Sequence, residues 1–169
     1  MTLITSLDAE ALYLDLLASI KKQTSDITNL AIVGIYSGGA WLAERLAADL
    51  ALDHPAGYID VSFYRDDYAQ KGLHPEVLPT KIPFDVNDAN IILVDDVLYT
   101  GRTTRAAINE LFDYGRPARI MLATLVDRGG RELPIAADFV AFSANFKNTS
   151  SVHLQRAADG TLSLSINHA

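Results

Sequence analysis

The sequence predicts an α/β fold with a central, mainly parallel sheet flanked by helices. Short apolar runs rich in β-branched residues alternate along the chain with segments in which leucines recur at helical spacing. This alternation is typical of βαβ units, whose crossover helices cover the faces of a parallel sheet. The 169 residues contain no linker, repeat or low-complexity tract, so we expect one domain over residues 1–169.

The predicted elements follow in order along the chain. Apolar or alternating runs predict strands at 30–35, 58–64, 91–94, 120–126 and 139–142. Helices are expected after an N-cap at Ser6, from Trp41 to Leu50, and from about Arg102 to Tyr114. The polar segment at about 65–80 predicts a flexible loop, because a loop of that length inside a compact domain is usually a lid or a disordered segment. Asp159-Gly160 between two alternating runs predicts a hairpin at about 151–167.

Composition narrows the function classes. The net charge of −7 argues against a general nucleic-acid or membrane-binding protein. The charge is uneven, because residues 1–100 carry six basic and fifteen acidic side chains (net −9) and residues 101–169 carry eight and six (net +2). The second half can therefore hold a local anion site. The absence of cysteine fits a cytoplasmic location, and no apolar run reaches the roughly 18 residues of a membrane span.

Two adjacent carboxylates follow the apolar run at 91–94. Asp95 and Asp96 would lie at the carboxyl end of a parallel strand, where open α/β sheets bind ligands. A small-residue turn and a helix start come next, and unpaired amides there suit a phosphate. Carboxylates repel phosphate but accept hydrogen bonds from sugar hydroxyls, so segment 91–104 describes a ribose 5-phosphate site. The alternative is a solvated Asp-Asp turn before an ordinary threonine-rich helix start.

Segment 91–104 resembles the phosphoribosyl-pyrophosphate (PRPP) binding motif of the type I phosphoribosyltransferases. Segments 33–46, 59–67 and 125–134 occur around it in the order typical of the PyrR family, whose members regulate pyrimidine operons and make UMP from uracil. The similarity extends over about 30–142. It implies the type I phosphoribosyltransferase fold with a small hood, PRPP, uracil and UMP as ligands, Mg²⁺ as cofactor, and a homo-oligomer of two or more chains.

The resemblance also implies roles for the residues of the motif. Asp95 and Asp96 would hold the ribose hydroxyls and, through these or through water, Mg²⁺, and they would be catalytic together with Arg65. The phosphate would be bound by Tyr99, Thr100, Gly101, Arg102 and Thr103. The pyrophosphate loop would be formed by Ser37, Gly38 and Gly39, for which an ordinary strand-to-helix turn is the alternative.

The pyrophosphate loop departs from the family pattern. Many members carry a basic residue at about the position of Gly38, and this chain has none there. Backbone amides can still bind the anion, but without the help of that charge. Arg65 would compensate by closing over the phosphates as part of a lid. The alternative for Arg65 is an exposed ion pair with Asp66 or Asp67, which would contribute little.

The base is expected near the ends of the later strands. Asp127 and Arg128 follow the strand at 120–126. Phe139 and Val140 resemble the base-binding hood segment of related purine enzymes, in which a ring covers the base and a backbone edge reads it. For Asp127 and Arg128 the alternative is an ion pair at an interface. For Phe139 and Val140 the alternative is an ordinary core strand.

The sequence leaves two functions open. One is a working uracil phosphoribosyltransferase, and the other is a regulator that senses UMP or PRPP, binds RNA and turns over poorly. A third possibility is a transferase that acts on another base, such as a purine. RNA affinity depends on basic side chains that neutralise phosphates. Residues 1–29 contain only Lys21 and Lys22 as bases, and Arg131 is the only base within 131–142. We therefore expect RNA binding to be weak or lost while PRPP chemistry is retained.

Overall fold

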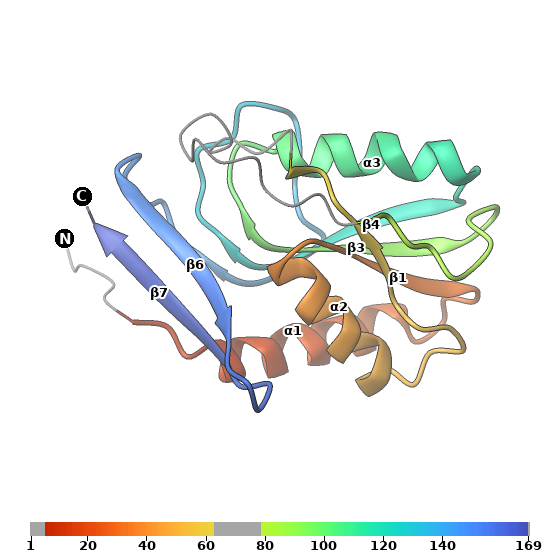
Figure 1. The fold of residues 1–169 in the computed structure, drawn as a ribbon, viewed down its shortest axis with the longest axis horizontal. Helices are drawn as coiled ribbons and strands as arrows, with labels where there is room; N and C mark the ends of the chain where they lie inside the picture. Colours follow the sequence, from red (N-terminus) through yellow and green to blue (C-terminus); the bar gives the residue numbers. More distant parts are fainter. Residues whose placement is uncertain (1–5, 63–78, 169) are drawn as a thin grey trace.

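The computed structural model describes residues 6–62 and 79–168 (Figure 1). Its central sheet has the strand order β2-β1-β3-β4-β5, and all its pairings are parallel. The strands are β1 (Leu30–Ile35), β2 (Gly57–Ile59), β3 (Asn90–Leu98), β4 (Arg119–Asp127) and β5 (Phe139–Ser143). The predicted parallel sheet is confirmed. Arg65 and most of the predicted loop at 65–80 lie outside the described residues.

Helices cover both faces of the sheet, as predicted. α1 (Ala9–Thr24) and α2 (Gly38–Asp49) pack on one face, and α3 (Arg102–Tyr114) packs on the other (Figure 1). Successive strand residues point to opposite faces, so β1 directs Ile32 into the core under α1 and α2 and Val33 into the core under α3. Among the described residues, no helix is long and apolar enough to cross a membrane.

Two helix starts differ from the prediction. α1 is capped by Asp8 rather than Ser6, because the Asp8 carboxylate accepts a hydrogen bond from the amide of Ala11 at 3.1 Å. α2 begins at Gly38, ahead of the predicted start at Trp41. The predicted break at 37–39 is therefore mostly the first turn of the helix itself.

Two strand ends also differ. β2 ends at Ile59, because the amide of Ser62 donates to the Asp60 carboxylate at 2.9 Å and forms an Asx turn there. β3 is longer than predicted and continues to Leu98, because its pairing with β4 persists to the register pair Leu98–Asp127. Asp95 and Asp96 therefore lie inside the last part of a strand rather than in the turn that follows it.

The predicted hairpin at about 151–167 is present as β6 (Ser150–Arg156) and β7 (Leu162–His168). It packs against the α1 and α2 side of the molecule (Figure 1). Glu10 of α1 joins the parts: its carboxylate accepts from the amide of Leu162 at 2.8 Å and pairs with Arg45 of α2 at 2.7 Å. The bond from Leu162, followed by the interaction with Arg45, holds the pKa of Glu10 below its ordinary value of 4.5.

Candidate functional site

Two strand-to-helix turns lie side by side at the carboxyl edge of the sheet. One turn links β1 to α2 and the other links β3 to α3, and β1 and β3 are hydrogen-bonded neighbours whose register runs to the pair Gly34–Val94. Ligands of open α/β sheets bind outside this edge. The arrangement therefore brings the predicted pyrophosphate loop next to Asp95, Asp96 and the predicted phosphate turn.

The β3–α3 turn borders a small, partly open hollow. The hollow is lined by Asp95, Val97, Leu98, Tyr99, Thr100, Gly101, Thr103 and Thr104. Four of the five residues predicted to bind the phosphate line this hollow. The fifth, Arg102, turns outward, and its guanidinium pairs with the Glu132 carboxylate at 2.8 Å.

The start of α3 suits an anion. The N-cap residue Gly101 adopts a left-handed conformation (φ 94°) and has no side chain to cap the helix. The first-turn amides of a helix lack intrahelical acceptors, and they carry the positive end of the helix dipole. The hydroxyl of Thr104 is also buried without a hydrogen-bond partner among the described residues. The hollow thus combines unpaired donors with a favourable field, which is what a phosphate requires.

The two aspartates differ in burial. Asp95 is buried, and one of its carboxylate oxygens accepts from the amide of Asp96 at 3.0 Å. Asp96 is half-buried, and its Oδ1 accepts from the amide of Val97 at 3.0 Å. Two carboxylates can accept bonds from sugar hydroxyls, and together with substrate oxygens and water they suit Mg²⁺. Among the described residues no group of three acidic, histidine or cysteine side chains forms a complete metal site.

The β1–α2 turn is built by close contact of glycine backbones. A Cβ on Gly38 would lie 2.4 Å from Oδ2 of Asp96, and one on Gly39 would lie 2.3 Å from the carbonyl oxygen of Val94. Ser37 is exposed and makes no side-chain cap for α2, and the Tyr36–Ser37 peptide bond is cis. The turn can offer an anion its backbone amides but no basic side chain.

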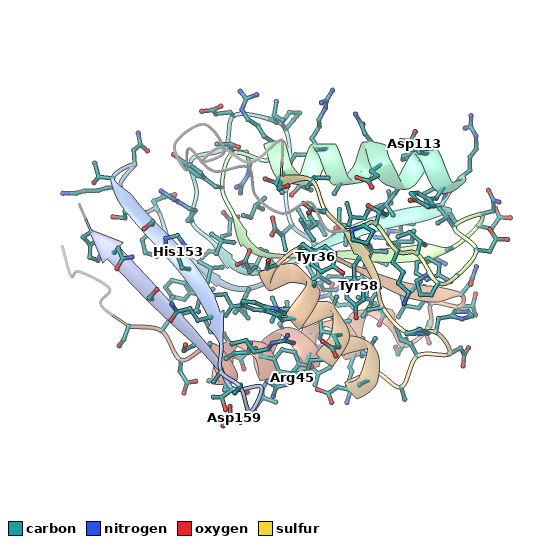
Figure 2. The ribbon with its side chains drawn as sticks, in the orientation of Figure 1. Tyr36, Arg45, Tyr58, Asp113, His153 and Asp159 are labelled. Atoms are coloured by element: carbon teal, nitrogen blue, oxygen red, sulfur yellow. The ribbon has the colours of Figure 1, made fainter. Side chains whose placement is uncertain are left out.

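Two tyrosines lie beside the β1–α2 turn. Tyr36 follows β1 and Tyr58 belongs to β2, and their ring centroids are 5.5 Å apart (Figure 2). Burial, with smaller contributions from Glu44 and Tyr36, raises the pKa of the Tyr58 hydroxyl. This hydroxyl stays protonated at neutral pH and can act as a hydrogen-bond donor. Neither tyrosine was among the residues predicted for the site.

The segment after β4 surrounds Tyr99 of the phosphate turn. The Arg128 guanidinium lies over the Tyr99 ring, 3.8 Å from its centroid, and Arg128 is buried. Asp127 pairs with Arg131 at 2.7 Å and accepts a bond from the amide of Gly129 at 3.0 Å. Among the described residues, Asp127 thus forms its ion pair with Arg131, four positions along the chain. Arg128 makes a cation–π contact with the Tyr99 ring. Arg131 was not among the residues predicted for the site.

The two residues predicted on β5 have different environments. The Phe139 side chain is 2% exposed and belongs to the core beneath α1, which corresponds to the core role that the sequence left open for it. Val140 is half-buried and pairs in register with Thr124 of β4. The base-reading role of the strand therefore remains a prediction that concerns Val140 more than Phe139.

The comparisons with known proteins agree with this geometry. The phosphoribosyl transferase domain family matches residues 5–157. A bifunctional protein PyrR from Ralstonia nicotianae is 51% identical over 156 residues, which are 91% of this chain and 89% of that protein. A second, from Nitrosococcus oceani, is 47% identical over 153 residues, with 88% and 86% covered.

Solved structures share the fold. A purine phosphoribosyltransferase from Pyrococcus horikoshii matches with a TM-score of 0.61 and 26% identity over 81% of this chain and 83% of that one. A hypoxanthine-guanine phosphoribosyltransferase from Bacillus anthracis matches with a TM-score of 0.69 over 99% and 100%, and its 15% identity bears on the fold alone. From the family match, the close relatives and the shared fold, it follows that this chain belongs to the phosphoribosyl transferase domain family and, within it, to the PyrR family.

Proposed function

We propose that the protein is a uracil phosphoribosyltransferase of the PyrR type, which makes UMP and pyrophosphate from uracil and PRPP. The observation that carries the proposal is the hollow of the β3–α3 turn, where threonine hydroxyls and the start of α3 lie with Asp95, while the carboxylate of the neighbouring Asp96 lies against Gly38 of the β1–α2 turn. A 5-phosphate and the hydroxyls of its own ribose need these two kinds of partner at adjacent positions. The name of its close relatives, bifunctional protein PyrR, supports the same assignment.

In this proposal the protein acts mainly by positioning. The α3 start and the hydroxyls of Thr100 and Thr103 fix the 5-phosphate, and Asp95 and Asp96 accept bonds from the ribose hydroxyls. The base then displaces pyrophosphate at C1 of the ribose through an oxocarbenium-like state, so correct alignment supplies much of the rate. The amides of the β1–α2 turn stabilise the departing pyrophosphate. Arg65 is proposed to assist as part of a lid.

Magnesium fits the donor set of this site. Asp95 and Asp96 would hold the ion directly or through water, together with oxygens of the substrate. When bound, Mg²⁺ supplies positive charge that neutralises part of the pyrophosphate. This positive charge matters here because the β1–α2 turn contains no basic side chain that could neutralise the pyrophosphate.

We place the base beside the segment after β4 and β5. Arg128 is a buried cation whose Nε has no hydrogen-bond partner among the described residues, so it can donate to a carbonyl oxygen of uracil after a small adjustment. Val140 would offer its backbone edge. Asp127 would act indirectly, because its carboxylate is engaged by Arg131 and Gly129. The homo-oligomer and the cytoplasmic location expected from the sequence are parts of the same proposal.

RNA-dependent regulation with poor turnover is the less favoured alternative. Arg131, the only base within 131–142, directs its guanidinium inward, to Asp127 and to two backbone carbonyls. It is therefore poorly placed to neutralise an RNA phosphate. We propose that RNA binding is weak, and submicromolar UMP-dependent retention of the chain's own pyrimidine-operon leader on a filter at physiological salt would contradict this.

The test of the proposed function is an assay with PRPP, Mg²⁺ and one base at a time. We expect uracil to give UMP, and hypoxanthine and guanine to give no nucleotide above background. The double variant Asp95→Asn with Asp96→Asn should keep the fold and lose PRPP use, because amides accept hydroxyl bonds less strongly and do not attract Mg²⁺. Nucleotide formation from a purine alone, or full activity of the double variant, would refute the assignment.

A further inference from the structure

The β3–α3 turn has no cap of its own, yet its backbone must be held in one shape to fit a phosphate. Gly101 provides no side-chain cap, and within the turn the amide of Arg102 bonds to the Thr100 hydroxyl at 3.2 Å. Further contacts that hold the turn come from one distant segment, residues 127–135, which we call the brace. We propose that Arg131 is a positioning residue that sets the shape of the phosphate turn through this brace.

The Arg131 guanidinium donates hydrogen bonds to three acceptors, one in the phosphate turn, one at the end of β4 and one further along the brace. Its Nη1 donates to the carbonyl oxygen of Tyr99 at 2.6 Å, its Nη2 to the Asp127 carboxylate at 2.7 Å, and its Nε to the carbonyl oxygen of Ile135 at 2.8 Å. The guanidinium is rigid and planar, so the three bonds fix the positions of their acceptors relative to one another. One side chain thereby ties the phosphate turn to the end of β4.

The backbone of the brace adds a second set of contacts. The amides of Glu132 and Leu133 both donate to the carbonyl oxygen of Thr100, at 3.0 and 3.1 Å. The side chain of Ile135 lies so close to Gly101 that an added Cβ would be 3.0 Å away. The brace therefore fixes the carbonyl groups of Tyr99 and Thr100, just before the helix start, by hydrogen bonds. The amides and hydroxyls of the turn can then face the hollow.

The ring of Tyr99 is held on two sides by the same segment. The Arg128 guanidinium lies 3.8 Å from the ring centroid, and a Cβ on Gly130 would be 2.4 Å from the ring. Gly129 and Gly130 adopt left-handed conformations, with φ of 72° and 80°, and these let the chain fold back over Tyr99. Arg128 is also the residue that we place at the base. The brace thus connects the proposed base site to the phosphate turn.

Arg131→Gln tests this inference with two readouts. We expect amide hydrogen exchange in residues 98–104 to become at least tenfold faster, because the carbonyl oxygen of Tyr99 loses its hydrogen bond from the Arg131 guanidinium. We also expect the KM for PRPP to rise at least tenfold, with a smaller change in the KM for uracil. The second readout rests on the proposed function, whereas hydrogen exchange reports on the brace whether or not PRPP is the ligand.

Two further variants complete the experiment. Arg119→Gln is the matched control, because it removes the same charge from an exposed side chain at the amino end of β4, and it should leave both readouts within twofold of the wild type. Arg131→Lys keeps the positive charge beside Asp127 but lacks the planar guanidinium with its several donors. This variant tests the positioning role if Arg131→Gln does not fold. We expect it to speed exchange in 98–104 as well.

The outcomes separate the two claims. Unchanged exchange in 98–104 in the folded Arg131 variants would overturn the positioning role, even if the wild type makes UMP. Faster exchange in a protein that binds no PRPP would uphold the brace and refute the proposed function. A merely structural role for Arg131 predicts lower thermal stability with both KM values unchanged, and this result would also overturn the inference.

Discussion

The two turns at the carboxyl edge of the sheet, to both of which we assign anion binding, are built in opposite ways. The β3–α3 turn surrounds a hollow with threonines and backbone, and residues 127–135 hold it from behind. The β1–α2 turn has little space, because its glycines press against Asp96 and against the backbone of Val94. One turn is shaped by partners from elsewhere in the chain, and the other by the absence of side chains.

The difference bears on the two anion sites that we propose at this one sheet edge. In the β3–α3 turn, hydroxyls and helix amides can match a single phosphate from several directions. In the β1–α2 turn, among the described residues, the donors are backbone amides and the Ser37 hydroxyl, so binding there depends on the backbone of α2 reaching the edge closely. The close approach of Gly38 to Asp96 therefore links the pyrophosphate position to the carboxylates that we assign to the ribose.

The largest effect is expected where the two turns meet. In Gly38→Ala the new methyl carbon would lie 2.4 Å from Oδ2 of Asp96, so either the carboxylate or the start of α2 must move. We expect PRPP affinity, measured by calorimetry with Mg²⁺, to fall at least tenfold, about 1.4 kcal/mol or more.

A second glycine provides the control for this variant. In Gly160→Ala the added carbon meets no atom within 4 Å, but the φ of 89° is unfavourable for alanine. This variant should lose about 1 kcal/mol of stability and keep its PRPP affinity. If Gly38→Ala bound PRPP with wild-type affinity, the β1–α2 turn would have space for a methyl group. This result would contradict the difference in packing between the two turns.

A smaller effect, confined to stability, is expected away from both turns. Glu10→Gln removes the ion pair with Arg45, whose side chain is 35% exposed, and weakens the bond from Leu162, so unfolding free energy at pH 7 should fall by about 0.5–1 kcal/mol. PRPP affinity should not change, since the affected hairpin contacts are separate from the two turns. A loss of affinity would mean that the hairpin also shapes the site.

The pH dependence of the same variant follows from the direction of the pKa shift. The folded-state pKa of Glu10 lies below 4.5, so its ionised form stabilises the fold above the unfolded-state pKa. This contribution is lost as the pH falls through the folded-state pKa. Denaturant titrations should therefore show the difference between wild type and Glu10→Gln at pH 7 and a shrinking difference below about pH 4.

Local signals explain why some features could be predicted from the sequence. α3 was predicted at its observed bounds, because its apolar spacing is regular and Gly115 follows it. The phosphate turn could also be predicted from the sequence, since all its residues are contiguous. The strand at Phe139 was also found, but a five-residue strand does not reveal which face is buried, and the ring proved to belong to the core.

The brace could not be predicted, because its contacts with the phosphate turn join residues 29 to 34 positions apart. Arg131 seemed to be one of a group of basic residues in the second half of the chain. The fold separates that group, since Arg119 begins β4 and Arg131 follows its end, and β4 is about 26 Å long from Arg119 to Asp127 at roughly 3.3 Å per residue. The Gly129-Gly130 pair was the one local signal of a fold-back, and its partner Tyr99 could be identified only in three dimensions.

Amide chemical shifts of the ¹⁵N-labelled protein test the assignment of the two turns most directly. Ribose 5-phosphate carries only the phosphate and sugar, so it should shift the amides of residues 100–104 and leave those of 37–39 in place. Pyrophosphate with Mg²⁺ should do the reverse, and PRPP with Mg²⁺ should shift both groups. Shifts at 37–39 with ribose 5-phosphate, or none at 100–104, would contradict the account.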